Sequence, residues 1–229
     1  MAHLRRHGEG STYVFEAPVR IWHWVMMLCM FALCVTGYLI GTPPPSTPGE
    51  ATNTFVFGFI RYIHFACAYV FSIMFALRVY WAFVGNRYSR EIFLIPLMLF
   101  SVEFWKGFFN QVAYYLFIKR HGKPYNGHNP LAAMSMFFMY VLGTIFMIVT
   151  GFGLYGEGTG AGSWAFRWFS SWVIPLVGQS QDLHTWHHLG MWYLILFSMV
   201  HMYMVVREDI YSDETVISTM VNGWRVPKS

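Results

Sequence analysis

Residues 182–209 read DLHTWHHLGMWYLILFSMVHMYMVVRED, and this stretch decides the fold. Its interior, residues 189–206, is almost wholly apolar. That interior comes close to the roughly 20 residues that an α-helix needs to cross a bilayer. We therefore predict a membrane-spanning helix at residues 187–206, with a histidine near each of its ends.

The spacing of those histidines indicates a cofactor. His187 lies 14 residues before His201, so on one helix the two side chains differ by about 40° around the axis and about 21 Å along it. An ionisable side chain within a membrane span is a candidate functional residue, and neutral imidazole is a common axial ligand of haem iron. The hypothesis is that this helix provides one axial ligand to each of two haems stacked across the membrane.

Composition places the whole chain in a membrane. Of the 229 residues, 56% are hydrophobic and only 11% charged, against about 25% charged in a soluble domain. We expect one integral-membrane domain spanning residues 1–229. The net charge of +4 comes from basic residues beside apolar spans, so it gives no reason to expect nucleic-acid binding. The chain has no Cys-x-x-Cys-His motif for covalent haem attachment, and its first twenty residues lack the apolar core of a signal peptide.

Three further spans are predicted, at residues 21–40, 63–83 and 131–150. The first ends before consecutive prolines, which cannot continue a helix. The third begins at Asn129, a good cap, followed by Pro130 at the first helical position. Residues 1–19 and 207–229 are expected to be a polar arm and tail, and residues 151–181 a long loop.

Residues 92–118 are ambiguous, because they are apolar and aromatic enough to form a fifth span. Pro96, Glu103, Lys106 and Asn110 interrupt them, so we interpret the segment as one or two helices lying in the membrane interface. The predicted fold is therefore an all-α transmembrane four-helix bundle, with interfacial helices between the second and third spans.

The basic residues predict the orientation of the bundle. With four spans, every lysine and arginine except Arg61 and Arg167 falls on one side. Cytoplasmic segments carry the excess of basic residues, so both termini are expected to be cytoplasmic. A fifth span would move His201 to the opposite face.

This topology puts four histidines at two levels. His23 pairs with His201 at the cytoplasmic level, and His64 pairs with His187 at the outer level. Gly37, 14 residues after His23, would leave room for a macrocycle at the outer level. Three arginines near these levels are candidates to bind haem propionates: Arg20, Arg61 and Arg78.

Other interpretations remain open at this stage. A single histidine at a helix end is more often an interface residue than a ligand, and His184 and His188 compete with His187 as the outer ligand. A di-metal site is disfavoured because no carboxylate lies among the spans except Glu103 in the ambiguous segment. The chain could also be a haem-free anchor, whereas a transporter is disfavoured by the lack of internal repeats.

Several motifs together resemble one family, the cytochrome b subunits of membrane-bound nickel–iron hydrogenases. They are YVFEAPVRIWHW (13–24), GEATNTFVFGFIRYIHF (49–65), GHNPLA (127–132), TGFGLYGEG (150–158) and DLHTWHHLGMW (182–192). The similarity extends over nearly the whole chain. A more distant likeness to the b-type subunits of formate dehydrogenases makes a subunit of formate dehydrogenase or thiosulfate reductase the alternative.

The resemblance implies a function. In the family, a periplasmic large subunit oxidises hydrogen, and electrons pass through an iron–sulfur small subunit that docks through a C-terminal membrane anchor. The outer haem b, here with His64 and His187, receives them, and the inner haem b, here with His23 and His201, passes them to a quinone. The resemblance also implies a location in the bacterial inner membrane. Candidate quinone contacts at the inner level are His128 and Asn129, with His201, Arg207, Glu208 and Asp209 as further polar groups.

Overall fold

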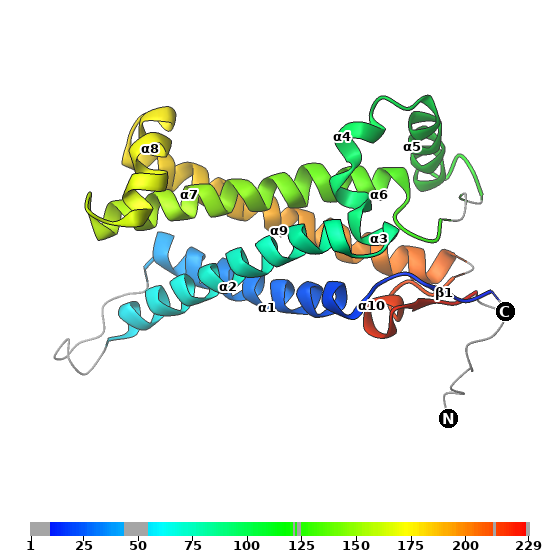
Figure 1. Ribbon diagram of the computed structural model, residues 1–229, viewed down its shortest axis with the longest axis horizontal. Helices are drawn as coiled ribbons and strands as arrows, with labels where there is room; N and C mark the ends of the chain where they lie inside the picture. The colour runs from blue at the N-terminus through cyan, green and yellow to red at the C-terminus, as the bar shows by residue number, and fades with distance from the viewer. Residues whose placement is uncertain (1–9, 44–54, 121, 123–124, 213, 228–229) are drawn as a thin grey trace. The chain divides into compact units, whose positions relative to one another are not determined.

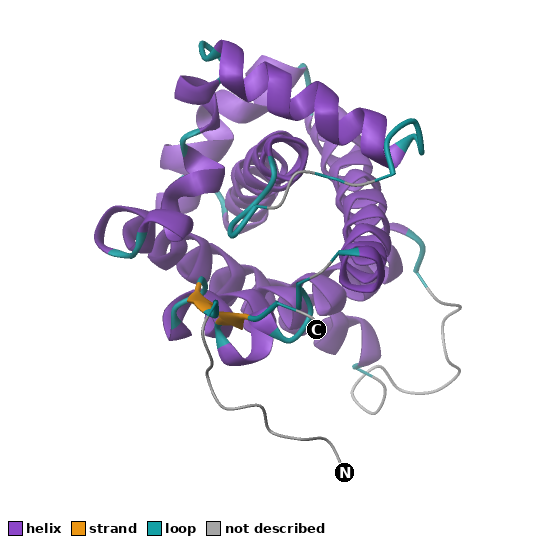
Figure 2. Cartoon of the chain, turned by 90° about the vertical axis from the view of Figure 1, so that its right-hand side faces the viewer, coloured by secondary structure: helices purple, strands orange, loops and turns teal. Residues whose placement is uncertain are grey.

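The computed structural model describes residues 10–43, 55–120, 122, 125–212 and 214–227. Four helices among these residues are long and apolar enough to cross a membrane. They are α1 (Ala17–Gly41), α2 (Val56–Val84), the continuous segment Pro130–Thr159 and α9 (Ser180–Tyr211). Figure 2 shows helices throughout, with strands confined to one short pair. The prediction of an all-α protein with four membrane spans is confirmed.

The helices are longer than the predicted spans. The second begins at Val56 rather than residue 63, so Arg61 and His64 lie inside it and not at its start. The third comprises α6 (Pro130–Ser135), the π-helix η3 (Met136–Val141) and α7 (Leu142–Thr159), and it continues beyond residue 150. The apolar residues mark only the part of each helix that lies within lipid. The backbone hydrogen bonds of the helix continue beyond that part, into more polar residues.

The chain forms two compact units, and the division falls within each of the four long helices. Unit 1 comprises residues 1–23, 78–138 and 198–229, and unit 2 comprises residues 24–77 and 139–197. His23 and His201 belong to unit 1, whereas His64 and His187 belong to unit 2. Each predicted pair is therefore contained in one unit.

In unit 1 a segment near the start of the chain pairs with a segment near its end. Strand β1 (Thr12–Tyr13) is antiparallel to β2 (Trp224–Arg225), which follows helix α10 (Thr219–Asn222). Val14 is fully buried beside the pair, and its N–H donates to Gly223 O at 2.8 Å. The described parts of the predicted polar arm and tail therefore form a small ordered structure; residues 1–9 of the arm lie outside the described residues. Strands of two residues are too short for an alternating pattern to reveal them.

Unit 1 also holds the segment between the second and third spans. It forms four short helices: α3 (Arg87–Arg90), η2 (Glu91–Phe93), α4 (Ile95–Met98) and α5 (Val102–Tyr115). The core of this region contains Ile95, Phe104 and Ala133. Among the described residues no fifth helix is long and apolar enough to span a membrane. The choice of four spans is confirmed, although the segment is more broken than the one or two helices predicted.

In unit 2 the region predicted as a long loop, residues 151–181, is mostly helical. After α7 the π-helix η4 (Phe166–Ser170) and α8 (Ser171–Val177) fold back against it. A Cβ added at Gly156 would lie 2.5 Å from the backbone of Ala165 and Phe166, and Ser170 Oγ donates to Gly153 O at 2.6 Å. The loop prediction was wrong because the glycines that suggested a loop allow close helix packing instead.

Candidate haem-binding sites

The first predicted pair is formed by His23 of α1 and His201 of α9. Their ring centroids are 6.3 Å apart and their planes are tilted by 52°. Two metal–nitrogen bonds of about 2.0–2.1 Å, together with two imidazole radii, span a distance close to this one. The separation fits a single metal ion held between the two rings.

Two of the predicted propionate-binding arginines lie in the same unit as this pair. Arg78 is buried, with its guanidinium 5.2 Å from the ring centroid of Trp22, and it donates to Ser89 O at 2.6 Å. Arg20 donates to Val221 O, and its Nε is buried without a hydrogen-bond partner among the described residues. Both cations are tied to backbone carbonyls, and Arg20 retains an N–H that could bind an additional group.

The second pair, His64 of α2 and His187 of α9, lines a cavity of about 730 Å³ in unit 2. Residues from α1, α2, α7 and α9 surround it, and most of them are apolar. This volume lies within the range of about 300–1,000 Å³ found for small-molecule and cofactor sites. The volume and the mostly apolar lining suit a cofactor-sized apolar group, with His64 and His187 in the cavity wall.

Two buried threonines contact the rings of the second pair. Thr36 Oγ1 lies 2.9 Å from His64 Nδ1, and Thr150 Oγ1 lies 2.8 Å from His187 Nδ1. The sequence reasoning missed both threonines. The repeated tripeptide Val-Thr-Gly, at residues 35–37 and 149–151, was the signal that could have revealed them.

The glycines that follow these threonines make room for the rings. A Cβ at Gly37 would lie 3.4 Å from His64 Cε1, and one at Gly151 would lie 3.2 Å from His187 Cε1. Both glycines also line the cavity. Gly37 therefore gives space to the His64 imidazole, and the room that it would leave for a macrocycle stays a prediction.

The geometry favours His187 over its two neighbours. The His184 side chain is exposed, and its Nδ1–H donates to Ser180 O at 3.0 Å. His188 packs against Trp192, with ring centroids 6.2 Å apart. All three histidines line the cavity, and a glycine lies beside the rings of both His187 and His188. The hydrogen bond to a buried threonine is found at His187.

Arg61 is the predicted arginine that lines the cavity of the second pair. Its guanidinium lies 5.7 Å from the ring centroid of Phe65, and the residue is exposed. An exposed cation at the rim of an apolar cavity suits the carboxylates of a bound ligand, because charge-assisted hydrogen bonds to carboxylates are strong.

Unit 1 brings the proposed quinone residues together with two that the sequence did not indicate. His128 N–H donates to Glu91 Oε2 at 2.9 Å, and His128 Nδ1 lies 3.4 Å from the same oxygen. Asn129 caps α6 through Ala132 N–H, as predicted, and its Nδ2 donates to Tyr115 Oη at 3.1 Å. Glu91 and Tyr115 were missed because both are far from these residues in sequence. Burial raises the pKa of Tyr115.

Several buried polar atoms near this region have no hydrogen-bond partner among the described residues. They are Gln111 Oε1, one Arg207 guanidinium nitrogen and Glu208 Oε2. The Arg207 guanidinium lies 4.7 Å from the ring centroid of Tyr114 and 4.9 Å from that of Tyr115. Buried polar groups normally bind a partner or an ordered water. This polar region could therefore bind a water molecule or a polar group of a ligand.

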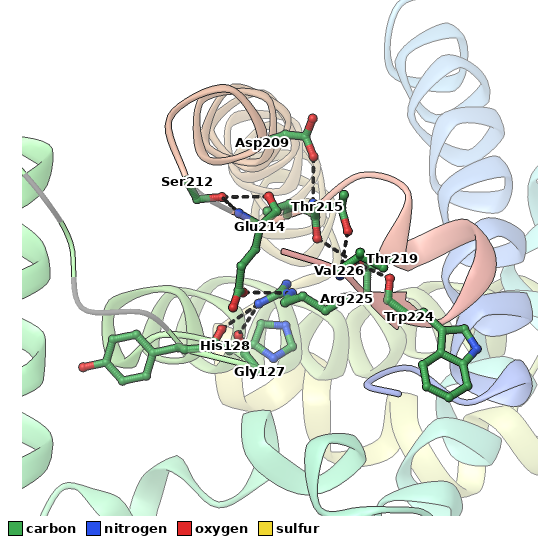
Figure 3. A network of polar contacts seen from close by, with 12 residues as sticks. Gly127, His128, Asp209, Ser212, Glu214, Thr215, Thr219, Trp224, Arg225 and Val226 are labelled. Carbon is green, nitrogen blue, oxygen red and sulfur yellow. Dashed lines mark hydrogen bonds and ion pairs between the residues drawn. The ribbon is translucent and has the colours of Figure 1, made fainter. Parts of the chain in front are cut away.

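The tail fixes the loop before His128, as Figure 3 shows. Arg225 donates to Tyr125 O at 2.7 Å and to Gly127 O at 3.2 Å, and its Nε lies 3.8 Å from Glu214 Oε2. Burial lowers the pKa of Arg225, although Glu214 opposes this shift. Asp209 accepts from Val216 N–H at 2.7 Å, which gives it a structural role in the tail.

Comparison with known proteins identifies the family of this chain. The family described as prokaryotic cytochrome b561 matches residues 14–223. A protein of Azotobacter chroococcum named "Probable Ni/Fe-hydrogenase B-type cytochrome subunit" is 56% identical over 96% of this chain and 90% of its own length. One of Escherichia coli strain K12, named "Probable Ni/Fe-hydrogenase 1 B-type cytochrome subunit", is 51% identical over 95% and 92%. The chain is therefore a multi-pass membrane protein of the prokaryotic cytochrome b561 family, whose cofactor is b-type haem.

Proposed function

We propose that this protein is the di-haem b-type cytochrome that anchors a periplasmic nickel–iron hydrogenase. The large subunit would pass electrons from hydrogen to the iron–sulfur small subunit. This protein would then transfer them from the small subunit across the bacterial inner membrane to quinone. The names of relatives at 51–56% identity support the hydrogenase as partner. The residues proposed to do this work are distributed over the whole chain, 1–229, as one functional domain.

The observation that carries the proposal is the pairing of the four histidines. His23 and His201 face each other at a ring separation of 6.3 Å in unit 1. His64 and His187 line one apolar cavity in unit 2. Because α9 contributes one histidine to each pair, one helix would connect two ligand sites.

Each bound haem b would supply one-electron oxidation and reduction at its iron. The four imidazoles would hold the iron, and the apolar cavity walls would exclude water, which raises the influence of nearby charges. Arg61 at the cavity rim, and Arg20 and Arg78 beside the other pair, would bind the propionates. The protein thus contributes spacing, orientation and electrostatics rather than bond chemistry.

The proposed quinone site lies in unit 1 around His128. The Glu91 carboxylate can accept from His128 Nδ1–H at 3.4 Å, which leaves Nε2 as the atom that gives or takes a proton. Asn129 is occupied as a helix cap, so it would contribute at most its remaining amide hydrogen. Gln111 Oε1 and Glu208 Oε2, which have no hydrogen-bond partner in the part of the chain that the structure describes, support a polar path for protons.

Substitution of one ligand tests the proposal. In the purified hydrogenase complex, His201→Ala should abolish hydrogen-dependent quinone reduction, while hydrogen oxidation with an artificial periplasmic acceptor survives. Met202→Ala is the matched control, because that side chain is 61% exposed on the same helix. Equal loss of both activities in His201→Ala would contradict the division of labour.

A further inference from the structure

We propose that Thr36 and Thr150 are positioning residues that fix the tautomer and rotation of His64 and His187, so that each ring presents Nε2 to the haem iron. The inference rests on the proposed haem ligation by these two histidines. It adds a second layer to that site, made of two side chains that bind no iron themselves. Partners of this kind orient metal-bound imidazoles and raise their basicity.

The direction of each hydrogen bond follows from the threonine's other contact. Thr36 O–H donates to Ala32 O at 2.7 Å, one helical turn earlier. Thr150 O–H donates in the same way to Phe146 O at 2.8 Å. A hydroxyl has one proton and two lone pairs. With the proton on the helix carbonyl, the oxygen can only accept, so the histidine must donate from Nδ1–H.

That direction decides the chemistry of each ring. A neutral imidazole carries one proton, and a proton on Nδ1 leaves Nε2 with a free lone pair. The distances of 2.9 Å to His64 and 2.8 Å to His187 are those of ordinary hydrogen bonds. Each threonine therefore selects the tautomer that a metal bound at Nε2 requires.

Burial strengthens both contacts and excludes water as a substitute. Thr36 is 6% exposed and Thr150 is 3% exposed. Hydrogen bonds inside a protein are electrostatically stronger than those in water. No solvent molecule would need to take part, and the ring orientation is set by the helices themselves.

The same arrangement occurs twice, on two different helices. In each case a glycine follows the threonine, and its missing Cβ leaves room for the ring: the distance to Cε1 would be 3.4 Å at Gly37 and 3.2 Å at Gly151. The threonine is thus hydrogen-bonded to the ring while the glycine lets the ring come close to the helix. Repetition of this local geometry at both histidines of one cavity is the observation that carries the inference.

Isosteric substitution tests it in the intact hydrogenase–cytochrome complex. Thr36→Val and Thr150→Val remove the acceptor but keep the shape. Each should weaken binding of the haem held by His64 and His187 by about 10- to 100-fold and raise its redox potential, because a less basic ligand stabilises oxidised iron less. The potential of the other haem should not move. The measurements are haem content, potentiometric titration followed in the visible spectrum, and the EPR g values.

Two further variants separate a hydrogen bond from simple packing. Thr150→Ser keeps the hydroxyl, so it should restore the wild-type potential and g values. Thr144→Val is the matched control on the same helix, since Thr144 is fully buried and its hydroxyl has no partner among the described residues. It should leave both haems unchanged.

The outcomes distinguish this inference from the proposed function. Wild-type potentials and haem content in both Thr36→Val and Thr150→Val would overturn the inference. An equal shift of the potential in Thr144→Val would also overturn it, and so would a failure of Thr150→Ser to keep the wild-type potential and g values. If His187→Ala loses one haem while the threonine variants behave as wild type, the ligand assignment stands and only the inference fails. Retention of both haems in His187→Ala would overturn the ligand assignment itself.

Discussion

At the scale of single residues, the sequence predicted that His187 and His201 share one helix, whereas the environment of each histidine was not predictable. An interval of 14 residues indicated that His187 and His201 share one face of a helix, and the structure confirms that both lie on α9. The threonines beside His64 and His187 come from other helices, so the repeated Val-Thr-Gly tripeptide marks the threonines but does not indicate which histidines they contact. Glu91 was missed for the same reason, because it meets His128 from 37 positions away.

A comparison of neighbouring histidines tests the choice of ligand. His187→Ala should lower the haem content of the purified protein by about half, because it removes a ligand from one of the two pairs. His184→Ala should not, since His184 is exposed and its Nδ1–H already donates to Ser180 O. Pyridine haemochrome determination per mole of protein gives the answer. The reverse result would transfer the ligand role to His184.

Asn129 provides a residue-scale test of stability. Asn129→Ala removes the cap of α6 and the hydrogen bond to Tyr115, so we expect a loss of about 1 kcal/mol in stability. Asn129→Ser keeps a capping oxygen and should recover most of it. Thermal unfolding in detergent, followed by circular dichroism, measures the difference. An unchanged Tm in Asn129→Ala would contradict a contribution of the Asn129 cap to the stability of the protein.

At the scale of elements, apolar runs located the four spans, and glycines misled the interpretation of the segment after the third span. Residues 151–158 are predicted as loop, yet they continue α7 to Thr159. Glycine within a helix costs up to about 1 kcal/mol relative to alanine, but close packing against its bare backbone can offset this cost. At Gly156 the backbone of Ala165 and Phe166 comes within 2.5 Å of where a Cβ would lie, so the glycine serves packing that no sequence period encodes.

A pair of glycines on α7 tests this. Gly156→Ala should destabilise unit 2 and release haem from the His64–His187 site, because its new methyl group would collide with the backbone of Ala165 and Phe166. Gly158→Ala is the control on the same helix. Apart from its chain neighbours and the nearby backbone of its own helix, no described residue has an atom within 4 Å of its Cβ position, and alanine is the better helix former by about 1 kcal/mol. Haem retention during heating should fall in the first variant only. Equal retention in both would contradict the close packing.

At the scale of the whole molecule, the fold class and the number of spans could be predicted from hydropathy. The pairing of strand β1 with strand β2 could not. The strand pair Thr12–Tyr13 with Trp224–Arg225 joins residues more than 200 positions apart, a pairing that no short-range signal predicts. Orientation in the membrane stays a prediction, based on the placement of lysine and arginine.

Reporter fusions test that orientation. An alkaline phosphatase fusion after Gly160 should be active, because we expect that residue in the periplasm. A fusion after Lys119 should be inactive, and a green fluorescent protein fusion there should fluoresce, as in the cytoplasm. Phosphatase activity at Lys119 would reverse the proposed topology of the haem and quinone sites.

The central claim is that four histidines of one chain hold two haems, and the haem b content of the intact complex tests it most directly. Chemical determination of haem, combined with quantitative amino-acid analysis of the complex, should give two haem b per chain. Alanine substitution of either His23 or His64 should reduce that ratio to one. A ratio of one in the wild-type complex, unaffected by one of these two substitutions, would contradict the account.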